Sequence, residues 1–333
     1  MLRKKCPGLD SVTVAAAARL HLGFLDMNGG LGRRFGSLGL AIDRPATRLT
    51  IRRAPAPIVE GLEAERASRH LALLARHLGL SQAYRLTIHE AIPVHAGLGS
   101  GTQLALSIAA ALRLLEGIPA DPANDALLLR RGARSGIGLG LFQHGGLIVD
   151  GGRGARTATP PVVARMDFPT DWRVIVVLDP RSGGIHGRDE QAAFAGLADL
   201  EAASAAEICR VVLIKALPAL AEHDIQSFGD AIARLQEIAG EYFAPAQGGA
   251  SYSSASVGLV MEELRRHGAR GIGQSSWGPT GFAFAADARE ARRLCDRARE
   301  KAAARGIDMA VCKGVNHGAL VEGETFVTTK KPQ

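Results

Sequence analysis

The strongest chemical signal in the sequence is a segment of six residues that contains three glycines. It reads Gly97, Leu98, Gly99, Ser100, Gly101 and Thr102. Three glycines let backbone N–H groups turn toward one point, and a helix expected at residues 103–116 adds its dipole and its unpaired amides. The segment therefore predicts an anion cradle, to which the serine and threonine hydroxyls can also donate. A plain strand-to-helix turn is the alternative, but such a turn does not need three glycines.

The residues around this glycine segment restrict the kind of anion site. No Gly-Lys-Ser or Gly-Lys-Thr follows the glycines, so the segment is not a Walker loop. His95, two residues before the segment, is a candidate for binding the same ligand. A packed structural histidine is the alternative for His95.

Three polar residues near the start of the chain, Arg19, His21 and Asp26, are candidate catalytic residues. Arg19 could pair with a phosphate or with a carboxylate. Asp26 could hold a divalent cation or face a developing positive charge. The alternative is the end of a strand, with a surface aspartate in the turn that follows.

Two later groups of polar residues also lie beside glycines, and we expect them to contact the ligand. They are Arg134 with Ser135, and Arg181 with His186 and Glu190. The second group follows a strand expected at residues 173–178, and loops at strand ends often carry function. Glu190 is a second candidate metal ligand, or it could begin a helix and interact with the helix dipole.

A last polar segment lies around residue 277. Its candidate binding residues are Ser275, Ser276, Trp277, Gly278 and Thr280. Trp277 could form a flat wall for an aromatic ring, and a core tryptophan is the equal alternative.

The composition favours phosphorylated small molecules over nucleic acid. The chain of 333 residues has 40 basic and 33 acidic residues, a net charge of +7, and 5% aromatic residues. The positive balance suits anionic ligands. The arginines are scattered and the aromatics are too few for base-stacking platforms. A basic RNA-binding protein remains the alternative from another class, and it would show salt-sensitive RNA binding without turnover.

Four widely separated cysteines form neither a metal-ligand spacing nor a disulfide framework. No apolar run is long enough to span a membrane, and the basic residues near Met1 lack an apolar signal core behind them. We therefore expect a cytoplasmic protein without a membrane partner.

Strands and helices alternate along the whole chain and predict two α+β domains, residues 1–165 and 166–333. Two short strands, residues 38–42 and 47–51, are expected on either side of Pro45. Helices are expected at residues 60–78 and 125–134. A helical region is expected at residues 192–240, with breaks near Pro218 and His223.

The glycine segment resembles a known motif. Pro93 followed by residues 97–100 is similar to the phosphate-loop motif of the GHMP kinase superfamily. Residues 19–26 and 278–283 stand where that superfamily has its first strand and its late glycine loop. The resemblance covers nearly the full chain. It implies an N-terminal βαβ domain with a left-handed crossover and a C-terminal ferredoxin-like domain, with the site between them.

One departure from the superfamily bears on the chemistry. Kinases of the superfamily often carry Ser-Gly-x-Asp-Asn, whose aspartate serves as base, whereas residues 135–139 read Ser-Gly-Ile-Gly-Leu. Gly138 stands at the aspartate position, and a glycine cannot take a proton. The departure argues against the alternative function, an ATP-dependent small-molecule kinase.

Residues 18–26, 134–138 and 275–280 resemble a non-kinase branch more specifically, the β-ribofuranosylaminobenzene 5′-phosphate synthase family. The resemblance implies condensation of 4-aminobenzoate with phosphoribosyl pyrophosphate, with release of CO2 and pyrophosphate, early in methanopterin biosynthesis. The carboxylate leaves as CO2, so no strong base is required. Mg2+ on the pyrophosphate, held by Asp26 or Glu190, and a homodimer are also implied. The choice between 4-aminobenzoate and 4-hydroxybenzoate stays open.

Overall fold

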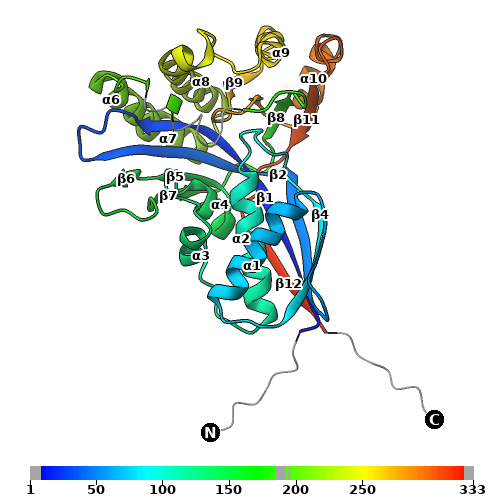
Figure 1. Cartoon of the computed structure of the whole chain (residues 1–333). Coiled ribbons are helices and arrows are strands. Elements are labelled where there is room, and N and C mark those ends of the chain that lie inside the picture. The colour runs from blue at the N-terminus through cyan, green and yellow to red at the C-terminus, as the bar shows by residue number, and fades with distance from the viewer. Residues whose placement is uncertain (1–8, 185–191, 194–195, 326–333) are drawn as a thin grey trace, which may run out of the picture.

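The computed structural model describes residues 9–184, 192–193 and 196–325. These residues form two β-sheets with helices packed on them (Figure 1). The larger sheet lies mostly in the N-terminal half of the chain. The smaller sheet lies in the C-terminal half.

The larger sheet is built on a long antiparallel hairpin of β1, Ser11–Asp26, and β2, Arg33–Ala54. The order along the main path is β12-β1-β2-β4-β3; β5 and β6 pair with β2, and β7 pairs with β5. The other strands are β3 Ile58–Gly61, β4 Ala83–Glu90, β5 Leu147–Asp150, β6 Arg153–Gly154, β7 Val162–Met166 and β12 Leu320–Glu324. The helices of this half are α1 Ala64–His77, α2 Ser100–Leu115, α3 Pro122–Leu128 and α4 Ile137–His144.

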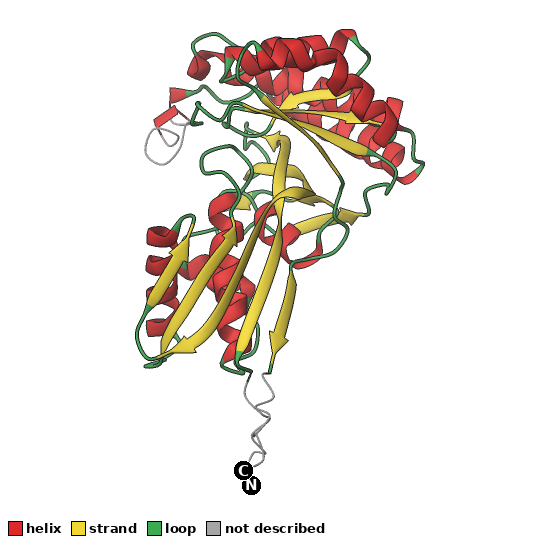
Figure 2. Cartoon of the chain, turned by 90° about the vertical axis from the view of Figure 1, so that its right-hand side faces the viewer, coloured by secondary structure: helices red, strands yellow, loops and turns green. Residues whose placement is uncertain are grey.

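The smaller sheet is antiparallel, in the order β11-β8-β10-β9. Its strands are β8 Arg173–Leu178, β9 Arg270–Gln274, β10 Thr280–Ala285 and β11 Asp308–Cys312. Its helices are α6 Ala202–Val211, α7 Leu217–Ala221, α8 Ile225–Phe243, α9 Ala255–Arg266 and α10 Ala288–Ala303. A π-helical turn, Val212–Ala216, joins α6 to α7, and a 3-10 turn, Ala244–Gln247, follows α8. Figure 2 shows helices lying over both sheets.

Strand β1 connects the two halves of the molecule because it contributes to two cores. Val12 and Val14, near its start, pack with α1 and α2 under the larger sheet. Leu20, Leu22 and Phe24, near its end, pack in a second core with side chains of α6, α8 and β10. The pairing of β1 with β2 shifts register after Ala17 and again after His21. Such irregularities bend a strand, and so one continuous strand can follow both packing surfaces.

The helix starts follow directly from the sequence. Asp224, Ser254 and Asp287 each accept a hydrogen bond from a backbone N–H in the first turn, at the starts of α8, α9 and α10. These side chains satisfy donors that have no partner inside a helix. Helix α2 has no such cap: Gly99, in the left-handed conformation, precedes it. The open start of α2 is therefore available to a ligand.

The structure corrects four expected elements. Residues 38–51 belong to one strand, β2, which continues through Pro45. The helix expected at residues 60–78 begins later, as α1, because residues 58–61 form β3. Gly61 has φ +100°, and an added Cβ there would lie 2.2 Å from the carbonyl oxygen of Ile88 on the parallel neighbour β4. The helix expected at residues 125–134 is α3, which ends at Leu128 before the left-handed Arg130. Pro218 does not break its helix, because it stands at the first turn of α7, where its missing N–H costs nothing.

The expected break near His223 is confirmed, since this residue has φ +57° between α7 and α8. Among the elements that were not expected are α4 and β9. Both are rich in glycine, which lowers helix and strand propensity, and both are stabilised by packing instead.

The boundary between the two domains, near residue 165, stays a prediction. The topology adds one fact to it: β12, at residues 320–324, pairs antiparallel with β1 in the larger sheet. A division by residue number alone therefore separates β12 from its sheet.

Candidate active site

The glycine segment, residues 97–102, lies at the start of α2 and is fixed from both sides. Gly97 and Gly99 both have φ +79°, a conformation that favours glycine. The amides of Thr102 and Gln103 donate to the carbonyl of Gly99, at 3.1 and 3.2 Å. Leu98 is buried and accepts a hydrogen bond at its carbonyl from the Arg19 amide, at 2.9 Å. The segment thus has one defined shape before any ligand binds.

A second loop, residues 275–280, is clamped onto the glycine segment, and we call it the late loop. The Thr280 hydroxyl donates to the carbonyl of Ala96 at 2.6 Å, and the Ser275 hydroxyl donates to that of Gly97 at 2.8 Å. The approach is close enough that a Cβ added to Gly278 would lie 2.2 Å from the Ala96 carbonyl. Ser275 and Thr280 therefore hold two loops together through backbone groups.

These two loops form the walls of a cavity that encloses about 590 Å³, part of it open to solvent. We call it the loop cavity. Its lining residues are Arg19, His95, Gly97, Gly99, Ser100, Gly101, Thr102, Arg131, Ser276, Trp277 and Gly278. Two of them are arginines, and no carboxylate stands among the described residues that line it. An anionic ligand fits this wall chemistry.

Arg131 is the lining residue that sequence analysis missed. Its guanidinium lies against Gly101, where an added Cβ would be 2.9 Å from Nη1. Burial, and then the nearby Arg66, lower its pKa from the ordinary value, so Arg131 is a partly desolvated cation. A guanidinium in this state gains from an anionic partner. The only sequence signal was the pair of arginines, Arg130 and Arg131, within the helix expected at residues 125–134.

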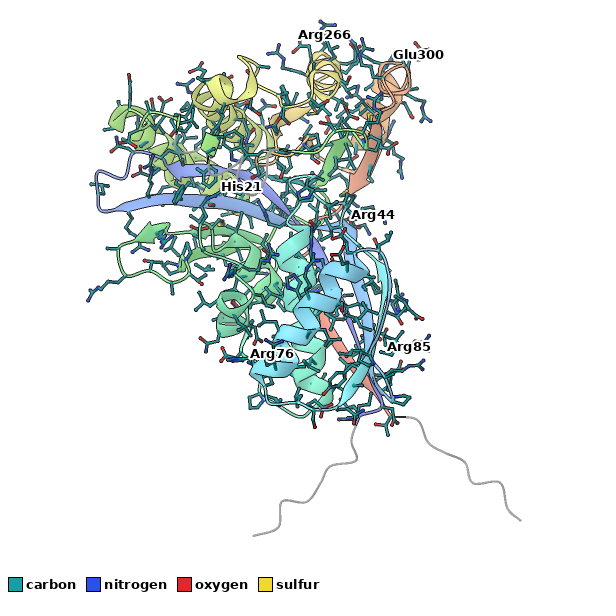
Figure 3. The ribbon with its side chains drawn as sticks, viewed as in Figure 1. His21, Arg44, Arg76, Arg85, Arg266 and Glu300 are labelled. Atoms are coloured by element: carbon teal, nitrogen blue, oxygen red, sulfur yellow. The ribbon has the colours of Figure 1, made fainter. Side chains whose placement is uncertain are left out.

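His21 lies on β1, where this strand passes the helices of the C-terminal half (Figure 3). Its side chain is 2% exposed, and its ring centroid lies 4.5 Å from that of Phe24. Its amide donates to the Ser275 hydroxyl at 2.9 Å, but neither ring nitrogen has a hydrogen-bond partner among the residues that the structure describes. Burial, then the charges of Arg19 and Arg134, hold the pKa of His21 well below its usual range. His21 is therefore neutral at pH 7.

A second cavity adjoins the first, and we call it the aromatic cavity. It encloses about 410 Å³, part of it open to solvent. Its walls include His21, Phe24, Phe243 and Trp277, and the amide side chains of Gln236, Gln247 and Gln274. Ser276 and Trp277 line both cavities. The two cavities therefore meet at the late loop.

Several predicted site residues lie elsewhere. Asp26 is in the turn after β1, where its Oδ1 accepts hydrogen bonds from the amides of Asn28 and Gly29, at 2.7 and 2.9 Å. It lines neither the loop cavity nor the aromatic cavity. Arg181 is paired with Asp179 at 3.0 Å and lines neither cavity. His186 and Glu190 lie outside the described residues. The roles predicted for these residues remain predictions.

Arg134 and Ser135 come just before α4 in the sequence. The Ser135 hydroxyl donates to Asp150 at 2.9 Å, and Asp150 also accepts from the amides of Gly136 and Gly152, at 2.8 and 2.9 Å. Asp150 is fully buried, and burial raises its pKa even though these hydrogen bonds oppose the rise. Sequence analysis missed Asp150, which fixes the loop that leads into α4.

None of the helices in the described part of the chain is both long and apolar enough to cross a bilayer.

Two sequence families match the chain. The family described as GHMP kinases N terminal domain matches residues 65–146, and the family described as GHMP kinases C terminal matches residues 216–304. Homoserine kinase from Cytophaga hutchinsonii has a similar structure, with a TM-score of 0.68 at 16% identity over 97% of this chain and 99% of that chain. Mevalonate kinase from L. major gives 0.69 at 15% identity over 96% and 100%. The chain has the two-domain α+β fold of the GHMP kinases, which confirms the predicted fold class.

Relatives of higher sequence identity show which family within the GHMP kinase fold this chain belongs to. The β-ribofuranosylphenol 5′-phosphate synthase of Archaeoglobus fulgidus is 31% identical over 290 residues, 80% of this chain and 85% of the relative. That of Methanothermobacter thermautotrophicus is 30% identical over 284 residues, 79% of this chain and 85% of the relative. The chain belongs to the β-ribofuranosylphenol 5′-phosphate synthase family, and the predicted branch and enzyme class are confirmed. The relatives are named for a phenol product, whereas the sequence resemblance was stated for the aminobenzene product.

Proposed function

We propose that this enzyme condenses a para-substituted benzoate with phosphoribosyl pyrophosphate to give a C-riboside 5′-phosphate, CO2 and pyrophosphate, early in methanopterin biosynthesis. The observation that carries the proposal is the loop cavity. It combines a glycine segment at a helix start with Arg19 and Arg131, and no carboxylate lines it among the described residues. This wall suits a diphosphate that must be held and then released as a leaving group.

The bonds of the proposed reaction balance without an added base. The ring carbon that bears the carboxylate attacks the anomeric carbon, and the bond from that carbon to the pyrophosphate oxygen breaks with its electron pair. The carbon–carboxylate bond then breaks, CO2 leaves, and its electron pair restores the aromatic ring. The enzyme has to bind and orient two anions and to exclude water from the cation-like ribosyl carbon.

The position of Gly138 supports this reaction over phosphoryl transfer. Gly138 lies in α4 directly behind the glycine segment, where an added Cβ would be 3.1 Å from the Thr102 methyl group. Its carbonyl accepts from the Gln103 amide group at 3.0 Å. A kinase of this fold that relies on an aspartate base at this position would need that carboxylate here. The decarboxylative condensation does not require it.

Mg2+ belongs to the proposal as the counterion of the diphosphate. Among the described residues, no group of three or more His, Cys, Asp or Glu side chains could hold a metal ion. The described residues therefore do not form a protein cage for Mg2+, and Mg2+ commonly binds through substrate phosphates with few protein ligands. We assign no step of the reaction to it. The homodimer implied by the family resemblance is also a proposal, which light scattering can check.

Release of labelled CO2 tests the proposed function. Purified protein with Mg2+, phosphoribosyl pyrophosphate and carboxyl-labelled 4-hydroxybenzoate or 4-aminobenzoate should release label. Release should stop when the ribosyl donor is omitted or replaced by ATP. Absence of release with both benzoates, from protein whose fold is verified by circular dichroism, would contradict the proposal and favour the kinase alternative.

Arg131→Ala should weaken binding of phosphoribosyl pyrophosphate roughly tenfold to hundredfold, because a hydrogen bond to a charged group contributes about 1.5–3 kcal/mol. Arg131→Lys should give an intermediate loss, since an ammonium keeps the charge but not the planar fork. Isothermal titration calorimetry with phosphoribosyl pyrophosphate measures both. Arg130→Ala is the matched control, because Arg130 is exposed and does not line the cavity. Equal losses of binding affinity in the Arg130→Ala and Arg131→Ala variants would show that Arg131 does not bind the ligand.

A further inference from the structure

The aromatic cavity has the wall chemistry of a site for a flat ring. The ring centroids of His21 and Phe24 are 4.5 Å apart, those of Phe24 and Phe243 are 6.1 Å apart, and those of Phe243 and Trp277 are 4.7 Å apart. These four side chains come from β1, α8 and the late loop. Aromatic walls at such spacings favour stacked and edge contacts with another aromatic ring.

The amide side chains in the cavity are already engaged with the protein. The Gln236 Nε2 donates to the Leu22 carbonyl at 2.6 Å, and its Oε1 accepts from the backbone N–H of Gln274 at 2.7 Å. The Gln274 Nε2 donates to the Gln247 Oε1 at 2.9 Å and to the Ser276 carbonyl at 3.0 Å. These bonds fix the shape of the wall. Because these glutamine side chains already make hydrogen bonds to the protein, they are less available to a ligand than a side chain without such bonds.

His21 differs from these amides. It is 2% exposed, it lines the cavity, and within the described part of the chain neither of its ring nitrogens has a hydrogen-bond partner. A buried polar group without a partner is uncommon and destabilising unless a ligand or a water satisfies it. Because the imidazole is neutral, one of its nitrogens can accept a hydrogen bond, which an arginine cannot do.

We propose that the aromatic cavity binds the benzoate acceptor, with its ring against Phe243 and Trp277, and that the ring of His21 accepts a hydrogen bond from the para hydroxyl or amino group. This inference rests on the proposed function. It adds where the acceptor binds and which residue recognises the substituent that makes the ring nucleophilic.

The two ends of the acceptor require different protein groups, and each cavity supplies the groups for one end. The carboxylate and the ring carbon that attacks have to face the ribosyl donor, and the cavities meet at Ser276 and Trp277. Arg19 lines the loop cavity and can pair with that carboxylate. The para group needs a hydrogen-bond acceptor, which His21 supplies inside the aromatic cavity. A hydrogen bond from the para group to His21 polarises its O–H or N–H bond and strengthens electron donation into the ring.

Tryptophan fluorescence tests the location of the acceptor without any turnover. The chain has two tryptophans, and Trp172 lies in the core against Phe168 and Phe228. Adding 4-hydroxybenzoate should change the emission of the wild-type protein and of the Trp172→Phe variant, and should leave that of the Trp277→Phe variant unchanged. An emission change that persists in Trp277→Phe would overturn the assignment of the cavity.

Ligands that differ only in the para group test the role of His21 on the wild-type protein. 4-Fluorobenzoate has nearly the shape of 4-hydroxybenzoate but no hydrogen to donate. The wild-type protein should bind 4-hydroxybenzoate about tenfold more tightly, since it alone can satisfy His21. Equal dissociation constants for the two ligands would overturn the role of His21.

The variant His21→Phe should remove this preference, so that both ligands bind with similar dissociation constants, while pyrophosphate binding stays unchanged. His89→Phe is the matched control, because His89 is exposed on β4 and should keep the preference. A His21→Phe variant that keeps the preference would overturn the inference. If the inference fails while the proposed function holds, wild-type protein still releases CO2. If the function fails, no CO2 is released whatever these ligands do.

Discussion

Gly97→Ala should lower turnover at least about hundredfold and abolish measurable pyrophosphate binding. Gly97 has φ +79°, and a Cβ at this position would lie 2.1 Å from the carbonyl oxygen of Ser275. The glycine segment and the late loop would have to separate, which would break the hydrogen bonds from Thr280 to Ala96 and from Ser275 to Gly97. A displacement of about 1 Å at reacting groups is enough for a hundredfold loss of rate. Calorimetry with pyrophosphate and the CO2 release assay measure the two effects.

Gly79→Ala is the control for backbone strain. Gly79 follows α1 with φ +68°, and nothing lies within 4 Å of an added Cβ. This variant carries the same kind of strain, about 1–2 kcal/mol, without the clash. It should bind pyrophosphate like the wild-type protein. Near-normal binding by Gly97→Ala as well would show that the two loops need not be in contact for the site to form.

Asp125→Ala should reduce the free energy of unfolding by about 3–5 kcal/mol. Asp125 on α3 accepts two hydrogen bonds from Arg113 on α2, both at 2.7 Å, and the two side chains are only 2% and 9% exposed. Removing the carboxylate leaves a buried guanidinium without its partner charge. The pair joins α3 to the helix whose start carries the glycine segment, so loss of stability and loss of site order are expected together. Urea denaturation followed by circular dichroism measures the change.

The exposed pair of Arg69 and Glu65 on α1 provides the comparison. Its side chains are 64% and 89% exposed, so Glu65→Ala should change stability by less than about 1 kcal/mol. The double variant Arg113→Met, Asp125→Leu should recover most of the lost stability, because no buried charge then lacks a partner. A loss below about 1 kcal/mol for Asp125→Ala would contradict this account of the pair.

The sequence alone predicted the features that depend on local chemistry. The glycine segment was recognisable because positive φ angles and an uncapped helix start have a direct composition signal, three glycines before an apolar run. The strand at residues 173–178 was predictable for the same reason, since its run of β-branched residues is a local feature. The resemblance to the GHMP kinase superfamily supplied the fold that connects them.

The features that sequence analysis missed depend on contacts between distant segments. Arg131 is one scattered arginine among many, and only the packing of its loop brings its guanidinium to Gly101. Asp150 follows a four-residue strand and shows no motif, yet three groups from two segments donate to it. The prediction of Asp26 as a catalytic and metal residue relied on its nearness in sequence to Arg19. Along an extended strand, however, seven residues span roughly 23 Å.

The sequence by itself predicted an anion site at a helix start, and it shows which residue types are absent from that segment, above all a carboxylate at Gly138. The tertiary structure alone decided what lies beside that site. The bend of β1 and the clamp of the late loop bring His21, Phe24, Phe243 and Trp277 around one cavity, from segments more than two hundred residues apart. Burial and two neighbouring arginines then hold His21 neutral. Protonation and enclosure depend on the whole surrounding volume, which no local pattern of residues specifies.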